Sequence, residues 1–184
     1  MGMPPSFDTV HFTGAMAMVA GFLYVFSRYD TTHPIESIIL GVAFVAYILL
    51  TALPRKYWML VRFIDWFITV PLLLYTVSKF GSVPFWVLAG LSIGMLGAGY
   101  LAILGNPKDY MLFNSIGFLF YFALLASLLL SKNTLPSWIY AFFGSWVLYG
   151  FVDRLEGPQD HWSYTALDIL SKPIFIALLL NELP

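Results

Sequence analysis

The sequence lacks cysteine altogether, which excludes disulfide bonds, thiolate catalysis and cysteine-ligated metal sites. Charge is scarce as well, because only 10% of the 184 residues are Asp, Glu, Lys or Arg, against about 25% in an average soluble domain. Hydrophobic residues make up 60% of the chain, a share that is typical of polytopic membrane proteins. We therefore predict an integral membrane protein whose first partner is the lipid bilayer.

The chain also lacks the long basic run that a nucleic-acid partner requires, and its formal net charge is −1. We predict no nucleic acid as a partner. The three histidines, His11, His33 and His161, are too far apart in the sequence to indicate a metal site. We predict no bound metal and expect no enzymatic activity.

Seven apolar stretches follow one another along the chain, separated by short breaks rich in Pro, Gly, Asn and charged residues. They cover roughly residues 9–28, 35–53, 57–78, 83–104, 109–131, 136–153 and 162–181. Each is close to the ~20 residues that a helix needs to cross ~30 Å of hydrocarbon. We predict an all-α membrane protein, a seven-transmembrane-helix bundle with very short loops, in which residues 1–184 form a single domain.

The positive charges in the connections leave the membrane orientation open. With the N-terminus outside, the inner connections hold Arg28, Lys79 and Lys132, and the outer connections hold Arg55, Lys56, Lys108 and Arg154. Three against four does not satisfy the positive-inside rule, so the sequence alone does not choose a topology.

Four charged residues lie deep within the apolar stretches, namely Arg62, Asp65, Asp168 and Lys172. Others lie at the edges of the spans, such as Glu36, Asp109 and Asp153. An ionised group at bilayer depth costs at least ~2.5 kcal/mol, so each deep charge is expected to have a partner and a function. Because the third and seventh spans run in the same direction, depths can be compared at about 1.5 Å per residue. Asp65 lies about 12 Å, Asp168 about 9 Å and Lys172 about 15 Å below one surface.

These depths predict that Asp65 faces Lys172 across the bundle and that Arg62 offsets the second carboxylate, Asp168. Asp168 and Lys172 are four residues apart, which places them on one helix face. A neutral ion-pair cluster that only fixes the helix register is the alternative. It is the less favoured one, because hydrophobic replacements of such clusters often serve stability equally well.

Two motifs extend this prediction to a known family. The stretch RFIDWFITVPLLL, residues 62–74, resembles the third helix of the microbial (type 1) rhodopsins, the family of bacteriorhodopsin, in the spacing of its Arg, Asp, Trp, Thr and Pro. LDILSK, residues 167–172, resembles the seventh helix of that family, whose lysine carries retinal as a Schiff base. Weaker similarities are FVAY ending at Tyr47, GMLGAG at 94–99, and Trp146 with Tyr149.

The resemblance implies retinal as a covalent cofactor, bound as a Schiff base on Lys172. It implies that Asp65 is the counterion and proton acceptor, that Asp168 is the second counterion, and that Arg62 organises nearby water. The implied hydrogen bonds run from Tyr47 and Tyr149 to Asp168, and from Thr69 to Asp65. The implied cofactor contacts are Trp66, Leu73, Met95, Gly99, Trp146, Tyr149, Ser171 and Tyr47.

The sequence departs from the family pattern at several positions. Thr76 lies two turns deeper than Thr69, where outward pumps of the family commonly carry a carboxylate that returns a proton to the Schiff base; threonine cannot do so at ordinary pH. Gly150 stands where the family usually has proline, and Asp153 where it often has tryptophan. Pro173, next to the lysine, is expected to free the carbonyl of Ile169 and to bend the helix. Proton-release acids of the family occur near positions matching Glu156 and Asp160.

The leading interpretation is a light-activated retinal protein in which photoisomerisation drives a proton from the Lys172 Schiff base to Asp65. Weak, slow outward proton transport is the expected use, because the uptake side lacks a donor at Thr76. A photosensor that signals to a separate partner is one alternative, and a seven-helix membrane protein without a chromophore is another. We expect a prokaryotic cell membrane as location, and homo-oligomer formation stays open.

Overall fold

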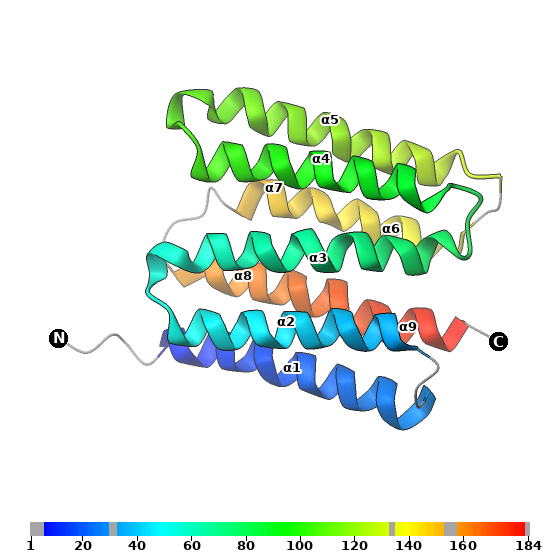
Figure 1. Cartoon of the computed structure of the whole chain (residues 1–184), viewed down its shortest axis with the longest axis horizontal. Helices are drawn as coiled ribbons and strands as arrows, with labels where there is room; N and C mark the ends of the chain where they lie inside the picture. Colours follow the sequence, from blue (N-terminus) through cyan, green and yellow to red (C-terminus); the bar gives the residue numbers. More distant parts are fainter. Residues whose placement is uncertain (1–5, 30–32, 133–134, 153–157, 183–184) are drawn as a thin grey trace. The chain divides into compact units, whose positions relative to one another are not determined.

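The computed structural model describes residues 6–29, 33–132, 135–152 and 158–182, and these residues form helices and short connections without any strand (Figure 1). The α-helices are α1 (Ser6–Tyr29), α2 (Pro34–Ala52), α3 (Trp58–Ser78), α4 (Phe85–Leu104), α5 (Tyr110–Leu129), α6 (Ser137–Ser145), α7 (Tyr149–Val152), α8 (Pro158–Ile169) and α9 (Phe175–Glu182). Four short turns join or extend them: the 3₁₀ turns η2 (Arg55–Tyr57), η3 (Pro107–Asp109) and η4 (Trp146–Leu148), and the π-helix η5 (Leu170–Ile174). The all-α prediction is confirmed.

The predicted spans agree with the helices in number and order. Within the described part of the chain, six helices are long and apolar enough to cross a membrane, and a shorter apolar helix covers Ser137–Val152. The sixth predicted span, 136–153, is therefore the short one, and the 3₁₀ turn η4 interrupts it. The seventh begins earlier than predicted, at Pro158 rather than 162.

Prolines explain where several helices begin. The ring of a proline at the first helical position fixes its backbone φ angle at a helical value. Proline also lacks an N–H, and the N–H groups of the first helical turn have no partner within the helix. Pro34 opens α2, Pro107 opens η3 and Pro158 opens α8. Pro84 and Pro136 precede α4 and α6 directly. The breaks that punctuate the sequence therefore become helix starts.

The interruption of the sixth span follows from local sequence. Gly144 and Ser145 come directly before η4, and Gly/Ser pairs are a common cause of helix irregularity. The hydroxyl of Tyr121 on α5 donates to the carbonyl oxygens of Phe143 at 3.0 Å and Gly144 at 3.2 Å. These bonds satisfy carbonyl groups at the point where the α-helical pattern changes.

The described residues pack as two compact units, one formed by Met1–Asp65 with Arg154–Pro184 and the other by Trp66–Asp153. In the first unit, α1 packs along α2 and also contacts α8, η5 and α9 (Figure 1). In the second unit, α4 packs along α5, and α5 contacts α6. The interpretation of the whole chain as one domain stays a prediction.

Glycines allow α1 to approach its neighbours closely. A Cβ atom on Gly14 would lie 2.2 Å from Cε1 of Tyr47 on α2, and one on Gly21 would lie 2.7 Å from Cβ of Pro173 in η5. Both distances are far below van der Waals contact, so only glycine fits there without movement of the neighbour. Gly14 therefore determines how near α1 lies to Tyr47.

Replacing Gly14 with alanine should lower the free energy of unfolding by about 1–3 kcal/mol, the usual range for overpacking a filled site. The Tyr47 ring cannot easily move away, because its hydroxyl is bonded to Asp168. Thermal unfolding in detergent measures the effect. Gly41→Ala is the matched control on α2, since nothing lies within 4 Å of a Cβ atom there. Equal loss of stability in both variants would contradict the prediction.

Candidate functional site

Four buried charged side chains meet in the first unit: Arg62 and Asp65 on α3, Asp168 on α8 and Lys172 in η5. None is more than 3% exposed. Nζ of Lys172 donates a hydrogen bond to Oδ2 of Asp65 and lies 3.7 Å from Oδ1 of Asp168. Nη1 of Arg62 donates to Oδ2 of Asp168 at 3.3 Å. The predicted pairing of Asp65 with Lys172, and of Arg62 with Asp168, is confirmed.

The two carboxylates have different surroundings. Asp168 accepts hydrogen bonds from Arg62 and, at 3.0 Å, from the hydroxyl of Tyr47 on α2, the latter as the family resemblance implied. Asp65 is the carboxylate in direct contact with the Lys172 amine. Asp168 is thus bonded by donors other than Lys172. Asp65 is therefore the better placed of the two to exchange a proton with Lys172.

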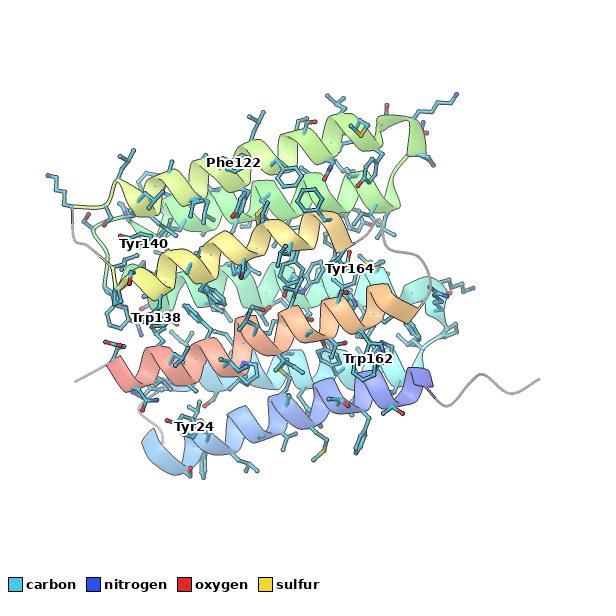
Figure 2. All side chains as sticks on the ribbon, turned by 180° about the vertical axis from the view of Figure 1, so that it is seen from behind. Tyr24, Phe122, Trp138, Tyr140, Trp162 and Tyr164 are labelled. Carbon is cyan, nitrogen blue, oxygen red and sulfur yellow. The ribbon has the colours of Figure 1, made fainter. Side chains whose placement is uncertain are left out.

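Aromatic rings surround the Arg62 guanidinium. Its central carbon lies 5.8 Å from the ring centre of Tyr47 and 5.0 Å from that of Tyr164 on α8, which Figure 2 labels. Cations over aromatic faces gain about 0.5–2 kcal/mol, more when water is excluded. Arg62 thus stays charged and fixed without reaching solvent, which keeps the four charges neutral in sum.

Lys172 lies in an irregular stretch of helix. The N–H of Phe175 donates to the carbonyl of Leu170, a bond that spans five residues and defines the π-helix η5. Pro173 has no N–H, so the ordinary four-residue bond to the carbonyl of Ile169 cannot form. The sequence predicted that the hydrogen bond to the Ile169 carbonyl would be lost. The structure shows that the backbone forms a π-helix at this point, a feature that occurs frequently at functional sites.

The predicted cofactor contacts divide between the units. Tyr47 and Ser171 belong to the first unit and are buried, and the Ser171 hydroxyl donates to the carbonyl of Asp168 at 3.4 Å. The others belong to the second unit, where Trp66, Leu73 and Trp146 are buried and Met95, Gly99 and Tyr149 are half-buried. That these residues line one slot for retinal stays a prediction.

Within the second unit, two of the predicted cofactor contacts touch each other. The rings of Trp66 and Tyr149 meet edge to face, with 5.3 Å between their centres. Thr69 and Thr76 are both buried, and the Thr76 hydroxyl donates to the carbonyl of Leu72 at 3.3 Å. That bond is internal to the helix, as is common for a threonine in an apolar span.

One departure from the family pattern, Gly150, gains a physical context. A Cβ atom on Gly150 would lie 2.6 Å from Cζ of Phe118 on α5, so the phenyl ring occupies the space that a larger residue would need. Glu156 and Asp153 lie outside the described residues. Asp160 lies in the first turn of α8. The release role of Glu156 and Asp160 stays a prediction.

An aromatic cluster next to the ion cluster was not anticipated. The Trp58 ring lies edge-on to His11 of α1 and to His161 of α8, with ring centres 4.4 Å and 4.6 Å apart. All three side chains are buried, and Trp58 precedes Arg62 by one helical turn. Because they come from three distant segments, no motif in the sequence could indicate their meeting.

Glu36 lies at the edge of a span, as expected, but its side chain is buried. Its side chain is 1% exposed, although α2 begins only two residues earlier, at Pro34. The reason is the helix face: Glu36 shares the buried stripe of α2 with Leu40, Ala43 and Tyr47. Glu36 lies near the end of α2, and its side chain is on the face of the helix that is buried in the protein.

A comparison with known protein families matches residues 6–183 to the family described as bacteriorhodopsin-like protein. The chain belongs to this family. Members of the family bind retinal, so the resemblance inferred from the third and seventh spans is confirmed for the family as a whole. A comparison with curated proteins gives no match.

Solved structures agree with this assignment of the bacteriorhodopsin-like chain. The crystal structure of viral rhodopsin OLPVRII is 24% identical, with a TM-score of 0.80 over 94% of this chain and 95% of that one. The light-driven proton pump rhodopsin of Coccomyxa subellipsoidea is 19% identical, with a TM-score of 0.82 over 99% of each chain. Exiguobacterium sibiricum rhodopsin is 18% identical, with a TM-score of 0.75 over 95% and 94%. These similarities show the seven-helix rhodopsin fold of an integral membrane protein.

Proposed function

We propose that this bacteriorhodopsin-like protein is a light-driven retinal protein that moves protons outward across its membrane, with retinal attached covalently to Nζ of Lys172. One observation carries the proposal: Lys172 is the only buried lysine among the described residues, and its amine meets two carboxylates. A lysine amine removed from water is favoured for condensation with an aldehyde, and the nearby anions balance the charge of the product. The residues present therefore fit the cofactor.

When bound, retinal would supply a light-triggered isomerisation that lowers the proton affinity of the Lys172 nitrogen. Asp65 would accept the proton, because its carboxylate already bonds that nitrogen. Asp168 would stay bonded to Arg62 and Tyr47. With the N-terminus outside, Asp65 lies on the outer side of Lys172, so a proton that leaves Asp65 toward Arg62 moves outward. Thr76 supplies no proton for the return step, which by itself predicts slow uptake and weak transport.

Illuminated cells that express the protein with retinal are expected to acidify an unbuffered medium. Each cycle would release a proton outside and take one up inside, so an uncoupler should abolish the signal. A pH electrode in the cell suspension measures it, and cells that express Lys172→Ala are the matched control. Alkalinisation that the uncoupler abolishes would mean inward transport and would overturn the direction.

A photosensor that signals to a separate partner is the second candidate, and the threonine at position 76 favours it, because signalling tolerates a slow cycle. The same cell experiment separates the two functions. If the medium stays unchanged although Asp65 takes up a proton in every photocycle, the sensor replaces the pump.

A further inference from the structure

Glu36 is a buried acid that the proposed proton path does not use. It is 1% exposed, and neither of its carboxyl oxygens has a hydrogen-bond partner among the described residues. Nδ1 of His33 lies 3.7 Å from Oε2 of Glu36. His33 is partly exposed, with 20% of its side chain accessible. The imidazole of His33 therefore links this buried acid to the protein surface.

The position of Glu36 follows from the buried stripe of α2. At one end of this stripe, Tyr47 bonds Asp168. Further along, Leu40 and Pro173 both lie beside Gly21, because a Cβ atom there would be 3.3 Å and 2.7 Å from them. Leu40 therefore lies at the level of Pro173, next to Lys172. Glu36 lies about 6 Å beyond Leu40, one helical turn further from Tyr47.

Glu36 and Asp65 consequently lie on opposite sides of Lys172 along the membrane normal. The Asp65 and Asp168 carboxylates are at the level of Tyr47, and Glu36 lies roughly 16 Å along α2 from that residue. Polar side chains at the Glu36 end of this unit include Tyr24, which Figure 2 labels, and Asn181; the two bond each other at 3.2 Å. With the N-terminus outside, this end is the inner one.

Glu36 has the chemistry that a proton donor needs. A neutral acid carries a transferable proton, which a threonine hydroxyl does not. Glu36 therefore has what Thr76 lacks, on the side of Lys172 where a returning proton has to come from.

We infer that Glu36 is the internal proton donor, which returns a proton to the Lys172 nitrogen in each cycle and is reloaded through His33. This inference rests on the proposed function. In the return step the Glu36 O–H bond breaks, the Lys172 nitrogen gains the proton, and a carboxylate remains. His33 then passes one proton from the inner aqueous phase to that carboxylate. The separation along α2 requires water molecules between donor and acceptor, so the transfer is not a direct contact.

Flash photolysis of the retinal-loaded protein tests the donor. Deprotonation of the Lys172 nitrogen appears as absorption at shorter wavelength, and the decay of that signal reports the return of the proton. In the unmodified protein the decay should be nearly independent of pH across the neutral range. Glu36→Gln should slow it roughly 100-fold, the lower end of what a positioned general acid contributes. In Glu36→Gln the decay should slow further as pH rises, and azide should restore it.

The matched control is Glu182→Gln, because Glu182 is an exposed acid at the same end of this unit. This variant should leave the decay unchanged. A normal visible band shows that each variant is folded. If the short-wavelength signal forms but decays alike in Glu36→Gln and Glu182→Gln, the donor is overturned and the proposed function stands. If no such signal forms in the unmodified protein, the proposed function fails and the donor with it.

Infrared spectroscopy gives a readout that does not depend on the photocycle. In the protein prepared without retinal, neutral Glu36 should give a carboxylic-acid C=O band that is missing from Glu36→Gln and present in Glu182→Gln. In unmodified protein with isotope-labelled glutamate carboxyl groups, the same band should shift in frequency. This sample identifies the band as that of a glutamic acid even if Glu36→Gln does not fold. Absence of any such glutamic-acid band at neutral pH would mean that Glu36 is ionised and would overturn the proposal.

Discussion

Replacing Lys172 with alanine is expected to leave a protein that inserts into the membrane but stays colourless when retinal is supplied. Lys172 is the only buried lysine among the described residues, and no other described lysine has two carboxylates against its amine. Loss of the amine removes both the attachment point and the cation that Asp65 bonds. Absorption spectra of the purified protein measure the visible band, and borohydride treatment tests whether retinal can be fixed to the chain.

The control for this variant is Lys132→Ala, because Lys132 is exposed. It removes one positive charge as well, yet it should retain the full visible band. A stable pigment in Lys172→Ala would refute the assignment of the attachment site. Removal of one member of a buried ion pair also costs about 3–5 kcal/mol, so the colourless protein should unfold at a lower temperature than the pigment-free unmodified chain.

The second large effect is expected at Asp65. Neutralisation in Asp65→Asn should move the visible band to longer wavelength and abolish outward transport. An anion next to the protonated nitrogen stabilises the positive charge of the ground state more than the displaced charge of the excited state, so its loss narrows the energy gap. Asp65 is the carboxylate in direct contact with Nζ, whereas Asp168 lies 3.7 Å away and is shared with Arg62 and Tyr47.

Acidification gives an independent version of the same experiment. Protonation of Asp65 removes the same charge, so the band of the unmodified protein should move to longer wavelength as pH falls and return as pH rises. In Asp65→Asn this pH-dependent shift should be absent. Asp109→Asn, at an exposed position, should behave like the unmodified protein. An unchanged spectrum in Asp65→Asn would assign the counterion role to Asp168 instead.

The sequence allows the spans and the ion pairs to be predicted because the bilayer restricts the possibilities. A helix must be about 20 apolar residues long to cross it, and a charge within it must find a partner. Arg62, Asp65, Asp168 and Lys172 balance in sign and match in depth, so their pairing follows. The stripe of Glu36, Leu40, Ala43 and Tyr47 is also visible in the sequence, and attention to helix face as well as depth would have identified Glu36 as buried.

Other features depend on contacts that no sequence pattern encodes. Pro173 predicts an irregular helix, but whether the backbone forms a π-helix depends on its neighbours, among them Gly21. The meeting of His11, Trp58 and His161 depends on how three separate helices pack. The interruption at η4 had a local signal in Gly144 and Ser145, yet its position also reflects the Tyr121 hydroxyl supplied by α5.

The arrangement of the ion cluster also bears on how the chain enters the membrane. Transmembrane segments insert individually before they associate. Arg62 and Asp65 are three residues apart on one segment, and Asp168 and Lys172 are four apart on another, so each segment can form its own neutral pair while surrounded by lipid. In the folded unit the partners are exchanged, Lys172 with Asp65 and Arg62 with Asp168. The same four side chains thus ease insertion first and join the two segments afterwards.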